Sequence, residues 1–248
     1  MIEFFARAIL SLNSILFDNL GLTIIVVGIG SRLIFYPFFA QSIRYTKAMR
    51  ELKPKLDDIK KKHGHDMKKH AQEQSRVFRE HGVSPTAGAV SCVSIIVQLG
   101  VFILLFQSLN RIIDTGIETN FLIWDLAEPD VYRIGGVPFA LPGILVVSTA
   151  VFSFFQTKMI QPEGGTKQER GDKNKKKEGK PGFAEALSGT QSQLTYIIPL
   201  VILYSGTLFP AVLALYWVVS TIFGMIQQLM VAGPGGLKPW LVRLNLTK

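Results

Sequence analysis

Five long apolar stretches alternate with polar segments along the chain, at residues 22–42, 87–109, 137–160, 192–208 and 210–230. Each stretch is about as long as a helix needs to be to cross the hydrocarbon core of a bilayer. The pattern predicts an all-α polytopic membrane protein with five transmembrane helices in one core, residues 21–231. Pro138 and Pro142 then fall in the first turns of the third span, where proline is tolerated.

The first twenty residues have a different pattern. Apolar residues recur at helical spacing at Phe5, Ile9, Leu12 and Leu16, and polar residues interrupt them at Glu3, Arg7, Asn13 and Asp18. This alternation predicts an amphipathic helix over residues 1–20 that lies at the membrane surface. A disordered leader is the alternative. We find no basic region followed by a cleavage site, so we expect no signal peptide.

The charged segment 44–83 has twelve Lys and Arg residues against six Asp and Glu. A narrow apolar stripe runs through its first part, at Met49, Leu52, Leu56 and Ile59. Gly64 suits a helix end, Asp66 a new N-cap and Gly82 a second end. The segment therefore predicts two antiparallel helices projecting from the membrane, with Pro54 kinking the first.

Other polar features carry less chemistry. The histidines of the charged segment, His63, His65, His70 and His81, have no cysteine beside them, so we expect no metal site and no cofactor. The lysine-rich loop 161–189 contains the run KNKKK and predicts disorder. Lysine beside a membrane is typical of a solvated or lipid-attracted loop, and we expect no DNA partner. Residues 232–248 form a short tail, and the single cysteine, Cys92, excludes an intrachain disulfide.

Orientation follows from the asymmetry of Lys and Arg. The charged segment has twelve, the 161–189 loop seven and the tail three, whereas residues 110–136 have two. The first three segments are therefore expected in the cytoplasm and residues 110–136 outside. Five spans with a cytoplasmic C-terminus require the N-terminus to be outside.

Arg32 is the one charge in the first apolar stretch, and no carboxylate accompanies it there. A cation at that depth costs about 2.5–3.5 kcal/mol on insertion scales, and arginine cannot lose its proton to avoid the cost. Arg32 is therefore expected to face protein or trapped water. It is either a structural arginine bonded to neighbouring carbonyls or a functional cation lining a wet cavity.

Six segments, in order, resemble the insertase family of bacterial YidC, mitochondrial Oxa and chloroplast Alb proteins. They are GIGSRLIFYPF with Arg32 and Pro37, MRELKPKLDDIKKKHG with Leu52, Pro54 and Lys55, FREHGVSP, FLIWDLAEPD, FFQTKM, and LFPAVLALYWVVSTIFGMIQQ. The chain departs from the family at Ser84, at Thr86 and Ala87, at Gly100, and at Val212, where the family has glycine.

The resemblance implies a short, core-only bacterial insertase of the plasma membrane that is not an enzyme. Its partners would be nascent membrane proteins and the lipid bilayer, with the Sec translocon and the ribosome as further partners. A cytoplasm-open polar groove holding Arg32 would admit the hydrophilic flank of an incoming span without nucleotide. The expected groove residues are Arg32, Ser31, Gln98, Gln156, Tyr216, Trp217, Ser220 and Thr221; ordinary interhelical hydrogen bonding is the alternative for each polar member.

The alternative function is a small anion transporter or channel subunit that uses Arg32 as a binding site. Such proteins commonly show internal repeats and broken helices, and we see no two-fold repeat here. The sequence also has no P-loop, no Ser/His/Asp pattern and no metal cluster, which argues against an enzyme.

Overall fold

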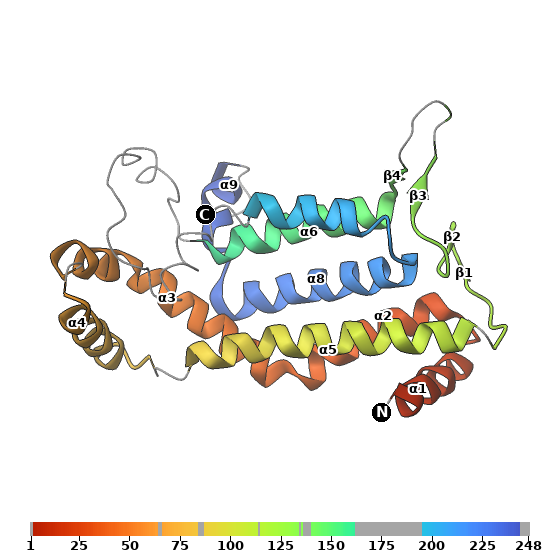
Figure 1. The fold of residues 1–248 in the computed structure, drawn as a ribbon, viewed down its shortest axis with the longest axis horizontal. Helices are drawn as coiled ribbons and strands as arrows, with labels where there is room; N and C mark the ends of the chain where they lie inside the picture. Colours follow the sequence, from red (N-terminus) through yellow and green to blue (C-terminus); the bar gives the residue numbers. More distant parts are fainter. Residues whose placement is uncertain are drawn as a thin grey trace. The chain divides into compact units, whose positions relative to one another are not determined.

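A computed structural model describes residues 2–63, 66–83, 87–113, 115–133, 135, 140–161 and 195–243 (Figure 1). Most of these residues are helical, which confirms the predicted helical class. The helices are α1 (Ile2–Ile15), α2 (Leu20–Ile34), α3 (Tyr36–His63), α4 (Met67–Glu80), α5 (Ala87–Ile113), α6 (Ile144–Ile160), Thr195–Ser205, α8 (Ala211–Ala232) and α9 (Lys238–Arg243), with a short 3-10 helix at Gly235–Leu237.

Among the described residues, two helices are long and apolar enough to cross a membrane, at Ile96–Ile113 within α5 and Ala211–Ala232. The pair α1 and α2 passes the same test only if taken together, although the two are bent by 119°. The helices Ile144–Ile160 and Thr195–Ser205 are apolar but shorter. The apolar helices agree with a membrane protein, and the number of spans stays a prediction.

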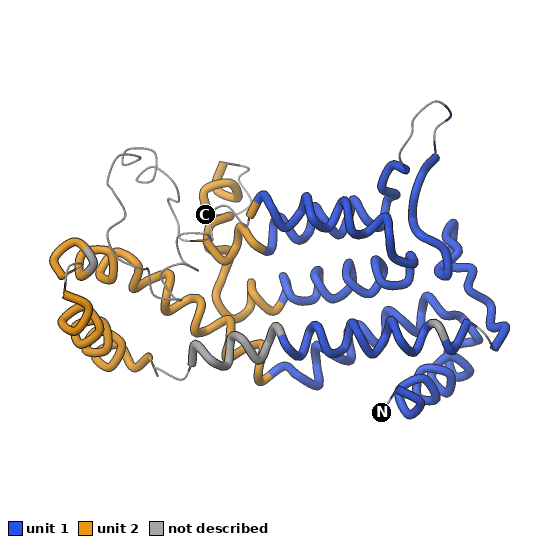
Figure 2. The backbone as a smooth tube through the Cα atoms, viewed as in Figure 1, with its two compact units in different colours: residues 1–36, 95–156, 196–226 blue, residues 37–94, 157–195, 227–248 orange. Residues whose placement is uncertain are grey.

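The chain divides into two compact units (Figure 2). Unit 1 contains residues 1–36, 95–156 and 196–226, and unit 2 contains residues 37–94, 157–195 and 227–248. The buried apolar core of unit 1 joins α1, α2, α5, α6 and the first half of α8. Leu20, Ile24, Ile112 and Leu126 are its most deeply buried aliphatic members outside α8 and α6.

The first predicted span, 22–42, is wrong as a single helix. Helix α2 ends at Ile34, where the Phe35 N–H donates to Ser31 O, and α3 begins at Tyr36. Pro37 explains the break, because its nitrogen has no hydrogen to donate and its ring would clash with the carbonyl four residues earlier. Proline is tolerated in the first turn of the new helix.

The third span also begins later than predicted. Helix α6 starts at Ile144 rather than at residue 137, and Pro142 lies in a strand, not in the helix. The sequence analysis missed four two-residue strands, which pair as β1 (Asn120–Phe121) with β2 (Trp124–Asp125) and β3 (Val131–Tyr132) with β4 (Leu141–Pro142). Pro138 is outside the described residues.

A loop between α5 and α6 fixes the starts of two helices in unit 1. The Asp130 carboxylate accepts hydrogen bonds from the main-chain N–H groups of Leu145 and Val146, so it caps α6. The same loop accepts from α8, because Ala211 N–H donates to Glu128 O. The turn between α1 and α2 is equally defined, since Phe17 and Asp18 adopt positive φ.

The charged segment forms α3 and α4. Asp66 caps α4 by accepting from the N–H groups of Lys68 and Lys69, as predicted, and Gly82 follows the helix with φ +65°. Helix α3 continues through Pro54, and the kink expected there stays a prediction. Gly64 and nearly all of the lysine-rich loop, residues 162–189, lie outside the described residues.

Candidate functional site

Arg32 lies in the last turn of α2 and is half-buried. Its guanidinium points at Gly224 of α8, since a Cβ atom on that glycine would lie 3.1 Å from both Cζ and Nη1 of Arg32. The same Cβ would lie 2.7 Å from Nε2 of Gln156 on α6. Three helices of unit 1 therefore bring a cation, an amide and a bare stretch of helix backbone together.

One turn earlier, α2 packs tightly against α8. A Cβ atom on Gly28 would lie 3.1 Å from Val219 Cγ1 and 3.6 Å from Tyr216 Cδ2. Gly28 and Arg32 are four residues apart and share one face of α2. The glycine thus brings the two helices close at the level of Tyr216, and the arginine follows on the same face.

The remaining polar candidates are held in different ways. The Ser31 hydroxyl donates to Gly28 O of its own helix at 2.9 Å. Ser220 and Thr221 are buried, and the Ser220 Oγ has no hydrogen-bond partner among the described residues. The structure therefore places these last two within the helix packing rather than on an open surface.

Gln98 and the aromatic candidates meet between α5 and α8. Nε2 of Gln98 donates to the Tyr216 hydroxyl at 3.3 Å, and Tyr216 is buried. Trp217 is half-buried and packs edge-on against Phe102, with ring centroids 5.8 Å apart. The structure therefore brings Gln98 into contact with Tyr216, beside the aromatic pair of Trp217 and Phe102.

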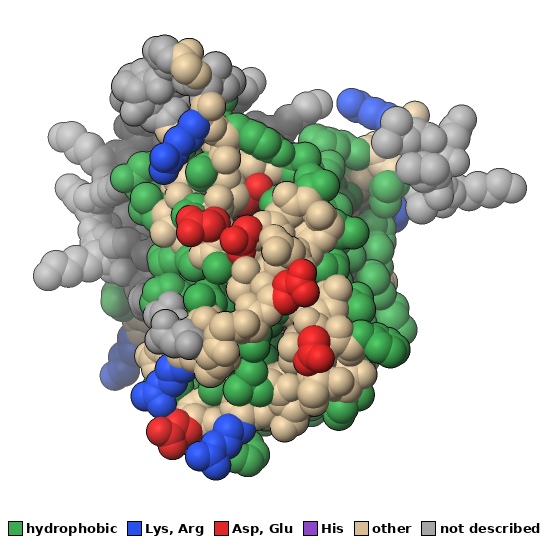
Figure 3. Space-filling model, turned by 90° about the vertical axis from the view of Figure 1, so that its right-hand side faces the viewer, with side chains coloured by type: hydrophobic (Ala, Val, Ile, Leu, Met, Phe, Trp, Pro, Cys, Tyr) green, Lys and Arg blue, Asp and Glu red, His purple; other side chains and the backbone are tan. Residues whose placement is uncertain are grey.

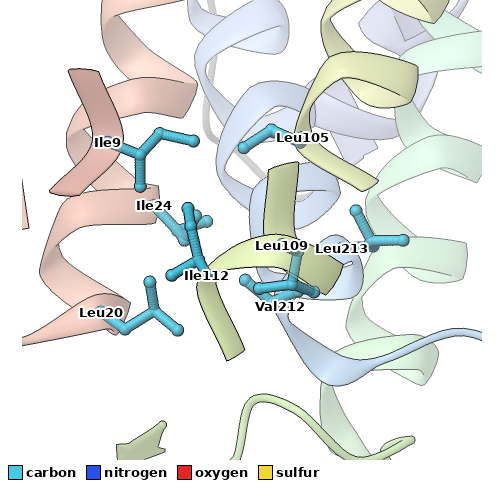
Figure 4. A pocket seen from close by; sticks show the side chains of 8 residues that line it. All are labelled: Ile9, Leu20, Ile24, Leu105, Leu109, Ile112, Val212 and Leu213. Atoms are coloured by element: carbon cyan, nitrogen blue, oxygen red, sulfur yellow. The ribbon is translucent and has the colours of Figure 1, made fainter. Parts of the chain in front are cut away.

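Two cavities formed by described residues of unit 1 are lined mainly by apolar side chains. One is lined by Ile9, Leu20, Ile24, Leu105, Leu109, Ile112, Val212 and Leu213 (Figure 4). Val212, one of the positions where the sequence departs from the resemblance, lines this apolar region. The other cavity lies beside Trp217 and Phe102 and has Thr149 as its polar member.

Helices α3 and α4 of unit 2 contain the predicted residues of the charged segment. Leu52 and Val77 are buried there. Lys55 Nζ lies 2.7 Å from His81 Nε2, while Nδ1 of the same ring lies 2.8 Å from Val77 O. Both contacts are satisfied if Nδ1–H donates to the carbonyl and Nε2 accepts from the ammonium. No cluster that could hold a metal occurs among the described residues.

Sequence reasoning missed three residues. Gly224 sits inside α8, and a glycine in a helix interior signals a packing reason. Asp130 was not singled out, because the helix that it caps begins fourteen residues later. Arg50 was one of many hairpin cations, and no spacing marks its bonds to the carbonyls of Met159 and Ala232.

Comparison with known proteins gives a consistent result. The sequence model of the family described as 60Kd inner membrane protein matches residues 11–234. The membrane protein insertase YidC of Oceanobacillus iheyensis is 30% identical over 222 residues, which cover 88% of this chain and 76% of that protein. The membrane protein insertase MisCA of Bacillus subtilis is 32% identical over 221 residues, 88% of this chain and 72% of that protein.

The chain belongs to the YidC/Oxa1 insertase family. The YidC 2 insertase of Listeria innocua is a further relative, 28% identical over 221 residues that cover 87% of this chain and 65% of that protein.

Family membership settles the class of function. The chain is a membrane protein insertase and not an enzyme, and its substrates are membrane proteins that enter a lipid bilayer. The relatives do not support the transporter alternative. In this insertase, the polar residues gathered near Arg32 are candidates for the contact with a substrate.

Proposed function

We propose that this insertase works through a hydrophilic groove that contains Arg32, opens to the cytoplasm and to lipid, and is closed to the outside. The supporting observation is that Arg32 and Gln156 meet at Gly224, among three largely apolar helices. A guanidinium in apolar surroundings is costly and keeps its proton. Such a cation is retained where polar groups, water or a charged ligand offset the cost.

The groove gives a mechanism that needs no nucleotide. The hydrophilic flank of an incoming segment enters from the cytoplasm and exchanges part of its water for Arg32 and its polar neighbours. An acidic flank gains the most, because opposite charges attract more strongly in a site of low dielectric constant. The apolar segment then partitions into lipid, and this burial drives the flank across and releases the substrate.

Closure to the outside is supported by the packing of unit 1 at the other end of its helices. Leu20, Ile24, Ile112 and Leu126 are at most 1% exposed. The loop that contains Leu126 also bonds to the start of α8, since Val212 N–H donates to Leu126 O at 3.1 Å. This buried apolar cluster and the loop bonded to α8 support the proposal that the groove is closed to the outside.

The orientation belongs to the same proposal. Acidic side chains gather on the face of the molecule that carries the short strands (Figure 3). Lys and Arg concentrate instead in residues 44–83 and in the 161–189 loop. By the positive-inside rule, the α3–α4 hairpin and the C-terminal tail are cytoplasmic, and the N-terminus is outside.

Five spans and a surface helix complete the topology. We assign the first span to residues 20–34 together with the start of α3. The other four spans are α5, α6, the helix at 195–205 and α8. Helix α1 carries exposed Phe4 and Ile15, and exposed Phe17 follows in the turn before α2, so α1 suits the outer membrane surface. The ribosome and the Sec translocon are proposed as partners that deliver substrates.

Site-specific photocrosslinking to a stalled nascent chain with one transmembrane segment tests the groove. A probe at Gln98 or Trp217 is expected to crosslink to the substrate. A probe at Leu200, which is exposed on helix Thr195–Ser205, is the control and is expected to crosslink to lipid alone. Equal crosslinking of the nascent chain from all three positions would contradict a defined groove.

A further inference from the structure

We propose that Gly224 is a positioning residue of the insertase, because its missing side chain leaves the space in which the Arg32 guanidinium and the Gln156 amide lie. The inference rests on the proposed function, since it concerns the same cation. It adds a residue from a third helix that decides where the charge is held, and therefore how well an acidic flank can reach it.

The atoms nearest to a Cβ position on Gly224 belong to two polar side chains. A Cβ atom there would meet Gln156 Nε2 at 2.7 Å and Arg32 Cζ and Nη1 at 3.1 Å. The first distance is too short for any real contact, so the amide would have to move. The second is tight, so the guanidinium would have to shift by a few tenths of an ångström. Both groups therefore use the space that glycine leaves open.

Other glycines of the same helices differ from Gly224. The space beside Gly28 is filled by Val219 and Tyr216, so that glycine serves the close packing of α2 on α8. Gly30 has nothing within 4 Å of its Cβ position. Since glycine is a poor helix former, its presence in the interior of α8 calls for a compensating contact. At Gly224 that contact is polar and comes from the proposed groove cation.

The displacement of Arg32 and Gln156 is expected to grow with the size of the side chain that replaces Gly224. Gly224→Ala displaces the Gln156 amide and moves the guanidinium slightly. Gly224→Val fills the space and pushes the cation away from α8. Neither change removes a charge or a hydrogen-bonding side chain, so any loss of function should pass through the position of Arg32.

The test measures insertion in proteoliposomes of two substrates that differ only in an acidic or neutral translocated flank. Gly224→Val is expected to reduce insertion of the acidic-flank substrate roughly five- to tenfold, the usual size of coupling between residues in contact. Gly224→Ala should give a smaller loss in the same direction. Gly30→Ala is the matched control and should insert both substrates normally.

A double-mutant cycle separates positioning from packing. In an Arg32→Ala background, Gly224→Val should cause no further loss of insertion. The Gly224→Val protein should also unfold in detergent at a temperature close to that of Gly30→Ala. Arg32→Lys, which lacks the planar fork, should partly restore insertion to Gly224→Val. An equal loss for both substrates, or an undiminished loss in the Arg32→Ala background, would show that Gly224 serves packing alone.

The same experiment distinguishes this inference from the proposed function. If Arg32→Ala inserts the acidic-flank substrate normally, the groove-cation proposal fails and the role of Gly224 fails with it. If Arg32→Ala impairs insertion while Gly224→Ala and Gly224→Val do not, only the positioning role of Gly224 is overturned.

Discussion

The Asp130 carboxylate accepts a hydrogen bond from the main-chain N–H of Leu145, with 2.7 Å between Oδ2 and the nitrogen. Oδ1 of the same group accepts from Nε1 of Trp124 at 3.1 Å, and Asp130 is only 6% exposed. A buried carboxylate is stable where several donors replace its water. This one also faces the positive end of the α6 dipole, so it joins the loop between α5 and α6 to the start of α6.

Replacing Asp130 should therefore destabilise the start of α6 and the loop that precedes it in unit 1. Asp130→Ala removes a helix cap and leaves the Trp124 N–H without its acceptor, for an expected loss of about 2 kcal/mol. Asp130→Asn keeps one acceptor oxygen and should lose less. Thermal unfolding in detergent measures both, and Glu118→Ala, at an exposed acid of the same loop, is the control. An unchanged transition for Asp130→Ala would contradict the capping role.

Arg50 should hold the base of α3 against two helix ends in unit 2. Its Nη1 donates to Met159 O at 3.1 Å and its Nη2 to Ala232 O at 3.3 Å, and both carbonyls lie in last turns that lack helical partners. Arg50→Ala should speed amide hydrogen exchange in α3 near this residue and in Gly233–Leu237. Arg44→Ala, at an exposed arginine of the same helix, should leave exchange unchanged. Similar exchange in the two variants would mean that the two hydrogen bonds of Arg50 do not stabilise this region.

The topology has a direct test with single cysteines in a Cys92→Ser background. Lys61→Cys, in the charged segment, should react with a membrane-impermeant maleimide only in inverted vesicles. Leu122→Cys, at a residue 82% exposed in the outer loop, should react only in intact cells. Labelling of Lys61→Cys from outside would contradict the predicted orientation, and with it the opening of the groove to the cytoplasm.

The sequence predicted the features that depend on local pattern. Hydropathy located the apolar helices, and the Asp66 side chain was recognised as a cap because capping acts over only three residues. Proline chemistry was harder to apply. Pro37 breaks α2 from α3 through its missing N–H and its ring. Pro142 lies in a strand because it pairs with Val131, a partner that the local sequence does not reveal.

The site could be predicted only in part for the same reason. Arg32 and Gln156 are polar residues in apolar stretches, so the sequence alone identifies them as candidates for the groove. Gly224 carries no side chain, and its importance comes from two residues that approach it from other helices. Ser220 was expected to line the groove because it is a polar residue in a span, and its burial at 0% exposure depends on neighbouring helices that the local sequence does not reveal.

The most direct measurement of the groove-cation account compares Arg32→Ala with Arg32→Lys in reconstituted proteoliposomes, using the substrates with acidic and neutral flanks. Arg32→Ala should lower insertion of the acidic-flank substrate about tenfold, which corresponds to about 1.4 kcal/mol of lost charge attraction. It should affect the neutral-flank substrate much less, and Arg32→Lys should retain most insertion of both. Full insertion of the acidic-flank substrate by Arg32→Ala would contradict the account and leave Arg32 with a structural role.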